Sequence, residues 1–408
     1  MDTKIGIGTS NSNITQTAGT EAIQSAIQQL DNQPPTFLIL FADSKYDHPT
    51  LLNSISQVTN APLIGCTTAG EITPQGPSEN SLIIVAFSTS QIHFSTGIGQ
   101  NLSQQPVKAA EQAAQTALSQ CRQPDTRKTF LFFTDGLTAN QVAVLQGLQN
   151  ILGENFEIVG ATAADCTDFQ KTYVYHQGQV YNDSLVGVLI AGDIVTGTGI
   201  RTGWQSVGNS LKCTKAKNRV VYELDNQPAL DIYSLYLDTE RSQKLPQISF
   251  EYPFGIISNT QQLTNHQAQT PYLPLRACIN INQEDKGLTF GTEIPEGSLL
   301  TITAASRQEL IHQTQTAAQL AKDLLVGAKP LLVLNFASLG RRLVLKQRSD
   351  EELATIKEIL GQDVPMAGFY TYGEFGPLDK RDPDLQNPSF HNLSSTIWVL
   401  GSNIFTTQ

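Results

Sequence analysis

The sequence predicts an α/β protein of three related β-α-β-α-β-β units, which form mixed sheets flanked by helices, plus an α+β insert before the third unit. Three observations carry this prediction. Short apolar runs alternate with segments of helical periodicity. The same order of elements occurs three times along the chain. A Gly-x-x-Thr-x-Gly-Glu turn follows the same strand in two of these copies.

The first unit, residues 1–90, shows the two kinds of segment most plainly. Apolar residues between Ala22 and Leu30 recur at the spacing that makes one face of a helix. The continuous apolar run at residues 37–42 is too short for a helix and is typical of a buried strand. We expect two strand–helix pairs, a strand with its turn, and a closing strand, in the order 4–8, 22–30, 37–42, 51–58, 63–71 and 81–87.

Two further units repeat this order. The second is expected at residues 94–99, 107–118, 129–134, 142–152, 158–165 and 184–190. The third is expected at residues 299–303, 310–325, 331–335, 353–360, 366–374 and 395–400. Ser349 and Glu352 have the spacing of a capping box and mark the start of the second helix of the third unit. The shared order therefore indicates internal duplication.

A segment of different character separates the second and third units, at about residues 197–296. It predicts a helix at residues 228–236 and strands at 248–252 and 275–281, with loops rich in Gln, Asn, Pro and Gly, notably at 259–270. We place the division of the chain near residue 215. The domains and units that follow from this division are 1–215, with units 1–90 and 91–215, and 216–408, with the insert at 216–296 and the third unit at 297–408.

The repeated turn is the most specific motif. Residues Gly65 to Glu71 and Gly368 to Glu374 share it, whereas the second unit has Asp165 and Cys166 at its end. With the supporting segment at residues 228–231, these turns make the sequence similar to the FIST proteins over roughly residues 35–380. FIST proteins pair a FIST N domain with a FIST C domain, so the resemblance implies FIST N at 1–215 and FIST C at 216–408.

The resemblance also implies a function. It implies an intracellular sensory module in signal transduction that binds a small ligand such as an amino acid. Such modules are often fused to a signalling output or encoded beside one. We find no kinase, cyclase or receptor segment in the sequence, so we expect a signalling partner in trans, either a histidine kinase or a cyclase.

Composition excludes several other classes. The formal net charge of −11 argues against binding nucleic acid, because little basic surface would neutralise phosphates. The sequence contains no run of about 18 apolar residues that would indicate membrane insertion, and the N-terminus lacks a signal-peptide pattern. The five cysteines contain no Cys-x-x-Cys, so neither a disulfide framework nor a zinc knuckle is expected, and we expect a cytoplasmic protein.

The candidate ligand site lies at the repeated turns, because α/β sheets place ligands at the carboxyl ends of their strands. An amino acid needs an anion for its ammonium group and a cation for its carboxylate, and an arginine can grip a carboxylate with two hydrogen bonds. We therefore expect one pocket in the third unit, with two further candidates in the first turn. The candidate ligand-binding residues are Asn335, Arg341, Arg342, Tyr370, Thr371, Tyr372, Gly373, Glu374, Thr68 and Glu71.

Alternatives stay open for these residues and for the function. The turns could be repeated because their backbone needs glycine, and the tyrosines and Glu71 could belong to the core. We expect no catalysis and no metal site: Cys66 has Ala161 and Phe369 as its counterparts, so a spacer explains it better than a nucleophile. No cofactor is expected, but a haem-based gas sensor stays open, since a lone axial histidine such as His93, His176 or His312 needs no motif. A small-molecule enzyme and a scaffold are the remaining alternatives.

Overall fold

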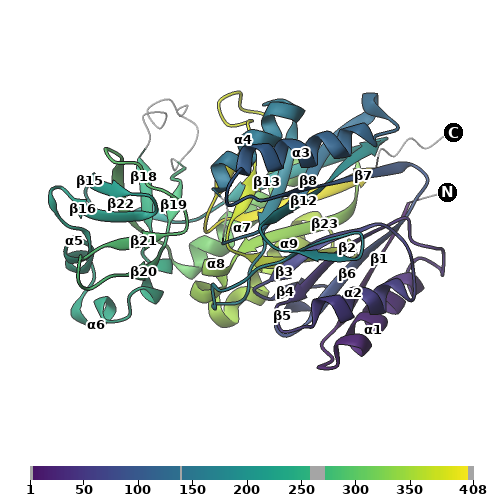
Figure 1. The fold of residues 1–408 in the computed structure, drawn as a ribbon, viewed down its shortest axis with the longest axis horizontal. Helices are drawn as coiled ribbons and strands as arrows, with labels where there is room; N and C mark the ends of the chain where they lie inside the picture. The colour runs from purple at the N-terminus through teal and green to yellow at the C-terminus, as the bar shows by residue number, and fades with distance from the viewer. Residues whose placement is uncertain (1–2, 138–139, 258–271, 403–408) are drawn as a thin grey trace.

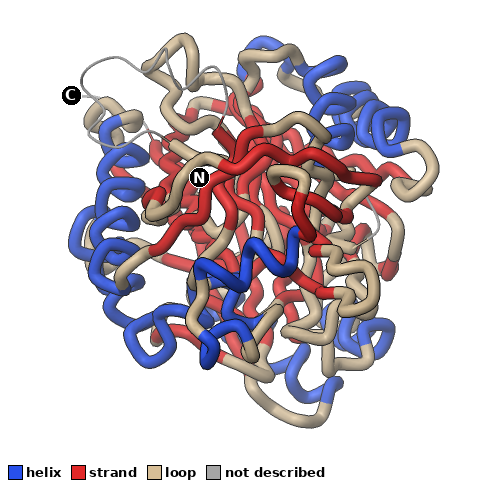
Figure 2. The backbone as a smooth tube through the Cα atoms, turned by 90° about the vertical axis from the view of Figure 1, so that its left-hand side faces the viewer, coloured by secondary structure: helices blue, strands red, loops and turns tan. Residues whose placement is uncertain are grey.

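The computed structural model describes residues 3–137, 140–257 and 272–402. Within these residues the chain forms a main body and a smaller lobe, which lies to the left in Figure 1 and which we call the insert lobe (β14 to β22, between residues 205 and 304). In the main body, strands occupy the centre and helices lie around them (Figure 2). The structure confirms an α/β protein of three related units whose mixed sheets are flanked by helices.

The first two units have the same sheet order. In each, two central strands run parallel, and the last strand lies antiparallel between the first strand and this pair, giving β1-β6-β2-β3 and β7-β12-β8-β9. The first unit contains β1 (Lys4–Ser10), α1 (Thr15–Gln28), β2 (Phe37–Asp43), α2 (His48–Ser56), β3 (Leu63–Thr68) and β6 (Leu82–Ser88). The second contains β7 (Ile92–Gln100), α3 (Pro106–Ser119), η1 (Pro124–Thr126), β8 (Arg127–Thr134), α4 (Gln141–Leu152), β9 (Glu157–Thr162) and β12 (Ser184–Gly192).

The third unit repeats the order as β13-β27-β23-β24. Its elements are β13 (Ile194–Arg201), α7 (Arg307–Asp323), β23 (Lys329–Ser338), α8 (Leu339–Leu345), η4 (Lys346–Arg348), α9 (Ser349–Leu360), β24 (Met366–Thr371) and β27 (Ser395–Ser402). The expectation that residues 299–303 form its entry strand is wrong. These residues form β22 (Leu299–Ala304), which pairs in the insert lobe, because β13 already occupies the free edge of β27.

A repeated strand–helix contact identifies β13 as the entry strand. Each entry strand carries Gly-x-Gly against the first helix of its unit, and a Cβ at Gly8 would lie 1.8 Å from the carbonyl oxygen of Ala22. Gly99 meets Ala109 and Gly199 meets Ala317 in the same way. The glycines therefore persist because the helix backbone lies directly on the strand.

Exchanged hairpins interlock the three units. Each unit sends a short hairpin to the sheet of another unit: β4 pairs with β24, β10 with β3, and β25 with β9. The hairpins are β4 (Glu71–Thr73) with β5 (Gly76–Ser78), β10 (Val174–His176) with β11 (Gln179–Tyr181), and β25 (Glu374–Gly376) with β26 (Ser389–His391). This exchange closes a ring of three sheets, and each sheet thereby gains two strands.

The centre of this ring is an aromatic core. Phe41, Phe133, Phe336 and Phe369 come from the central strands of all three units, and the rings of Phe41 and Phe133 meet edge to face at 5.2 Å. All four side chains are fully buried. Aromatic packing of this kind stabilises the junction at which the parallel strands end.

The insert lobe is a separate antiparallel sheet with its own core. The helix expected at residues 228–236 is present as α5, whereas the strand expected at 248–252 is wrong: a 3₁₀ helix forms there, and the flanking Pro246 and Pro253 cannot donate ladder hydrogen bonds. The loop at 259–270 lies outside the described residues. The lobe contains β14 (Gln205–Ser206), β15 (Leu211–Lys217), β16 (Val220–Leu224), β17 (Gln227–Pro228), α5 (Ala229–Tyr236), α6 (Thr239–Ser242), η2 (Gln247–Phe250), β18 (Phe254–Ile257), β19 (Leu275–Arg276), β20 (Cys278–Ile281), β21 (Leu288–Phe290) and β22.

The insert lies inside the third unit, between β13 and α7. The division of the chain near residue 215 stays a prediction. Across the described parts of the chain, no helix has both the length and the apolar character needed to cross a bilayer.

Candidate functional site

The repeated turns meet at the carboxyl ends of the central strands. The Ala69 amide donates to the Tyr370 carbonyl at 2.9 Å, and the Ala164 amide donates to the Thr67 carbonyl at 3.0 Å. A Cβ at Gly368 would lie 1.9 Å from the Asn335 carbonyl oxygen, so the first glycine of the motif is required by the neighbouring strand. The turns are therefore built into the junction between units.

The turn of the first unit is held together by buried hydrogen bonds. Glu71 is fully buried and accepts hydrogen bonds from the hydroxyls of Thr68 and Ser81. Burial raises the pKa of Glu71 to about 8. Thr68 and Glu71 thus hold their own turn, and neither lines the cleft described below.

The turn of the third unit is built in the same way. Glu374 is fully buried and accepts from the Ser394 hydroxyl at 2.7 Å, and burial raises its pKa to about 8. Asn335 is also buried, and its side-chain oxygen accepts from the Ser395 hydroxyl at 3.2 Å. Gly373 lies against the ring of Phe390. The structure therefore places Asn335, Gly373 and Glu374 inside the protein.

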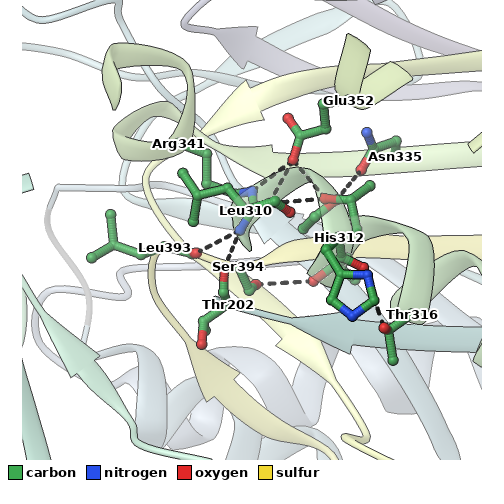
Figure 3. A network of polar contacts seen from close by, with 12 residues as sticks. Thr202, Leu310, His312, Thr316, Asn335, Arg341, Glu352, Leu393 and Ser394 are labelled. Carbon is green, nitrogen blue, oxygen red and sulfur yellow. Dashed lines mark hydrogen bonds and ion pairs between the residues drawn. The ribbon is translucent and has the colours of Figure 1, made fainter. Parts of the chain in front are cut away.

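Arg341 occupies a closed polar cage (Figure 3). Its guanidinium is fully buried and forms an ion pair with Glu352 at 2.7 Å. It also donates to the Leu310 carbonyl and the Thr314 hydroxyl, each at 2.8 Å, and to the carbonyl of Thr202. Because these groups come from α7, α9 and the segment after β13, Arg341 ties the third unit together.

Arg342 connects the first unit to the third. It donates to the Ala69 carbonyl at 2.9 Å and pairs with Glu79. Its guanidinium lies over the buried ring of Tyr370, 4.8 Å from the ring centre. Arg342 and Tyr370 therefore lie together, but apart from the cleft described next.

A cleft opens between the main body and the insert lobe. It lies past the carboxyl ends of β8, β9, β23 and β24 and is partly open to solvent. Of the ten candidate residues, Thr371 and Tyr372 line it. Such a place, at strand ends and between two lobes, is where α/β proteins commonly bind ligands.

Arg276 is the main polar group of this cleft. It ends β19 of the insert lobe, is 8% exposed, and lies 5.8 Å from the centre of the Phe390 ring. Its Nη1 donates to the Leu275 carbonyl at 2.7 Å and to the Asn392 side chain at 3.4 Å, whereas its Nε has no hydrogen-bond partner. Among the described residues Arg276 forms no ion pair, so it is a buried cation with unused donor capacity.

Stacked aromatic rings form another wall of the cleft. Tyr372 stacks on Phe169 with ring centres 4.6 Å apart, and its hydroxyl donates to the carboxylate of Asp165. The same carboxylate accepts from the Phe169 amide at 3.0 Å, so it positions both rings. Burial and the adjoining Asp165 raise the pKa of Tyr372, which keeps this phenol neutral.

Two more buried polar atoms along the cleft lack partners. The side-chain nitrogen of Gln141 donates to the Asp135 carbonyl at 2.9 Å, while its Oε1 has no donor. The Thr292 hydroxyl is also unpartnered. Buried polar atoms in folded proteins are usually hydrogen-bonded, so unsatisfied atoms that share one cleft indicate a place for a polar ligand.

Sequence reasoning missed Arg276, Gln141 and Thr292. Arg276 interrupts the apolar stretch at residues 275–281, and a charged residue inside a predicted strand is the one signal the sequence offers for it. Gln141 and Thr292 belong to no motif and reach the cleft through tertiary structure alone.

Among the residues that the structure describes, no histidine is placed to hold a haem in this cleft. His48 bonds to Tyr175, His176 to Thr96, and His391 to the Gly376 carbonyl, and burial lowers the pKa of His48 and His391 to about 4. No histidine is found among the described residues that line the cleft. Over the described part of the chain, no three His, Cys, Asp or Glu side chains are grouped to hold a metal.

Relatives of known sequence are similar over most of the chain. An uncharacterized protein of Methanocaldococcus jannaschii is 24% identical over 295 residues, which is 67% of this chain and 54% of the relative; the chain thus spans about half the length of that relative. An uncharacterized protein of Mycobacterium tuberculosis is 21% identical over 378 residues, covering 92% of this chain and 95% of the relative.

Solved structures give a weaker likeness. A cyanuric acid hydrolase from A. caulinodans aligns with a TM-score of 0.39 at 6% identity, covering 98% of this chain and 99% of the other. A second cyanuric acid hydrolase structure aligns with a TM-score of 0.36 at 7% identity, covering 98% and 100%. Similarity at this level carries no inference about activity.

Family models match nearly the whole chain. The FIST N domain matches residues 36–227, and the FIST C domain matches residues 229–377. The matches contain most of the residues that line the cleft, among them Gln141 in the first domain and Arg276 and Tyr372 in the second, whereas Phe390 lies beyond them. The chain therefore belongs to the FIST family, whose domains serve in sensing and signal transduction.

Proposed function

We propose that this protein is a sensory module that binds a small carboxylate metabolite, an amino acid or a similar compound, in the cleft between its lobes. The observation that carries this proposal is the buried, incompletely bonded guanidinium of Arg276. A ligand carboxylate can accept two hydrogen bonds from a guanidinium. The family membership supports small-ligand sensing as the general role.

The energetic argument starts from the cost of a buried charge. An unpaired cation that is removed from water is unfavourable, and a buried donor without an acceptor adds a penalty of ~1–3 kcal/mol. An anion bound at Arg276 would relieve both costs. The rings of Phe169, Tyr372 and Phe390 line the same cleft and would cover an apolar or aromatic body of the ligand.

The signalling step of the proposal follows from the position of the cleft. Arg276 and Thr292 belong to the insert lobe, whereas Gln141 and Tyr372 belong to the main body. A ligand that contacts both sides would favour one relative position of the lobes over others. We propose that a partner protein, a histidine kinase or a cyclase in trans, responds to this change.

Sensing rather than catalysis fits the chemistry of the cleft. The described lining residues include no aspartate, glutamate, histidine or cysteine that could act as a general acid, general base or thiol nucleophile. Cys66, which lies within β3, is fully buried, and burial raises the pKa of its thiol well above the usual range. A small-molecule enzyme is therefore the weaker proposal.

A thermal-shift screen tests the proposal. Purified protein is melted with amino acids and other small carboxylates, after its absorption spectrum has been recorded. A ligand that binds only the folded state raises the melting temperature. We expect at least one carboxylate to raise it in the wild type and in Arg127→Met, a substitution at an exposed arginine away from the cleft, but not in Arg276→Met.

Other outcomes would redirect the assignment. A shift that survives Arg276→Met keeps a sensor but moves its site elsewhere. No shift with any carboxylate contradicts the proposed function, and a Soret band would replace it with haem-based sensing.

A further inference from the structure

We propose that the cleft selects carboxylates that carry no ammonium group, such as 2-hydroxy acids with an apolar or aromatic body, over the corresponding α-amino acids. This inference rests on the proposed function and narrows its ligand class. It follows from the charge balance of the cleft, from the occupation of the nearby carboxylates, and from the kind of polar atom left without a partner.

The charge balance of the cleft favours an anion. Its described lining residues include two arginines, Arg276 and the exposed Arg219, and no aspartate or glutamate. Residues 138–139 and 258–271, which the structure does not describe, contain no acidic residue in the sequence. The ammonium group of a bound amino acid would therefore lose its hydration, and it would meet no anionic partner in the cleft. It would also lie close to positive charge, so its binding is unfavourable.

The aspartates behind the cleft wall are already engaged. Asp135 accepts from the Leu137 amide at 2.9 Å, from the Thr172 hydroxyl at 2.8 Å and from the Asp183 amide at 2.7 Å. Neither Asp135 nor Asp165 lines the cleft.

Asp165 has still more partners. Its oxygens accept from the amides of Phe169, Gln170 and Lys171, at 3.0, 2.7 and 2.7 Å, and from the Tyr372 hydroxyl. These bonds hold the loop that carries Phe169. An ammonium group could recruit Asp165 only by breaking bonds that shape the aromatic wall.

The unpartnered atoms that remain are neutral. Gln141 Oε1 is an acceptor, and the Thr292 hydroxyl can donate or accept. A ligand hydroxyl group both donates and accepts, so it can satisfy either atom without bringing a second charge. Together with Arg276, these residues match a 2-hydroxy acid: a cation for the carboxylate, and neutral partners for the hydroxyl.

Titration calorimetry with matched ligands tests this selection on the unmodified protein. The pairs differ only in the group on C2: 3-phenyllactate against phenylalanine, and 2-hydroxy-4-methylpentanoate against leucine, with 3-phenylpropanoate as the unsubstituted acid. We expect each hydroxy acid to bind at least tenfold more tightly than its amino acid, and Arg276→Met to abolish binding of both.

A designed variant tests the physical reason. Gln141→Glu places a carboxylate where a neutral acceptor stands, and should shift the preference at least tenfold towards the amino acid. Equal or tighter binding of the amino acids by the wild type, lost in Arg276→Met, would overturn the selection but keep the proposed function. If no ligand of either series binds in an Arg276-dependent way, both proposals fail. The wild-type comparison decides the matter even if Gln141→Glu does not fold.

Discussion

Arg341 in the third unit and Arg276 at the edge of the insert lobe are both buried arginines, but their surroundings differ. Arg341 pairs with Glu352 and donates to carbonyls and a hydroxyl from several elements. Arg276 has one backbone carbonyl, one long hydrogen bond to Asn392, and an Nε without a partner. All three guanidinium nitrogens of Arg341 have an acceptor without a ligand, whereas the Nε of Arg276 has none.

This difference shows how a charged side chain that stabilises the fold can be distinguished from one that binds a ligand. Proximity to the repeated motif favoured Arg341 as a ligand-binding residue, yet its cage leaves no donor for an external anion. Arg276 is remote from the motif in sequence, but it faces a cleft whose other polar atoms also lack partners. Unused hydrogen-bonding capacity is therefore the better guide to a site than closeness to a motif.

The same substitution at both arginines tests this difference, and it should lower the free energy of unfolding much more at Arg341 than at Arg276. Arg341→Met removes the counter-charge of Glu352 and leaves buried carbonyls without donors, which should destabilise the fold by ~3–5 kcal/mol. Urea denaturation followed by circular dichroism measures this loss. A change in the free energy of unfolding below ~1 kcal/mol would contradict the structural role of the cage.

Arg276→Met should show the opposite behaviour. Removing a buried cation that has no anionic partner should change the free energy of unfolding by less than ~1 kcal/mol, or raise it, in the absence of ligand. Binding of the carboxylate found by screening should weaken by ~30-fold or more, equivalent to ~2 kcal/mol. Calorimetric titration of wild type and variant measures the ratio. Unchanged affinity in a folded variant would remove Arg276 from the site.

Buried glutamates without a cationic partner should make the stability of the protein depend on pH. Burial raises the pKa of Glu71 and of Glu374 from the ordinary 4.5 to about 8, so the folded state keeps protons that the unfolded chain releases in this range. The part of the stability that these two glutamates contribute should therefore be full below pH 4.5 and fall as the pH rises towards 8. The slope contributed by each glutamate is at most ~1.4 kcal/mol per pH unit.

Glutamine substitutions provide the check on this pH dependence. Glu71→Gln and Glu374→Gln should each flatten the decline in stability between pH 5 and pH 8, measured by urea denaturation at several pH values. Variants whose stability changes with pH in the same way as that of the wild type would show that the two carboxylates are ionised in the folded state.

Arg219 should have the smallest effect. It is exposed at the rim of the cleft, where a single charge contributes ~1 kcal/mol or less and is screened by salt. Arg219→Gln should weaken carboxylate binding by less than about fivefold at low salt. The difference from wild type should disappear in 0.5 M NaCl. An effect as large as that of Arg276→Met would place the main anion contact at the rim instead.

Much of the fold could be predicted from local pattern, because strands such as residues 37–42 and helices such as residues 107–118 carry their own periodicity. The entry strand of the third unit was missed, although Gly197-x-Gly199 repeats the pattern of Gly6-x-Gly8. A long insertion separates this strand from its helix, so order along the chain gave the wrong partner. The exchanged hairpins have no local signal at all, since pairing between units depends on tertiary structure.

The candidate site could be predicted only in part. Thr371 and Tyr372 were expected at a ligand site because they lie at the carboxyl end of a parallel strand, and both line the cleft. This expectation needed only the strand topology, which the sequence indicated. Glu374 and Arg341 are residue types suited to bind an amino acid, but both side chains are buried, where Glu374 contacts Ser394 and Arg341 pairs with Glu352. Arg276 reaches the cleft because the insert lobe packs beside the main body, which no motif encodes.

The most direct test of the central claim is a crystal structure of the protein with the tightest-binding carboxylate found by screening. The account predicts that the ligand carboxylate lies within hydrogen-bond distance of the Arg276 guanidinium, with the ligand body against Phe169, Tyr372 or Phe390. A ligand bound elsewhere, with Arg276 left as it is in the free protein, would contradict the claim.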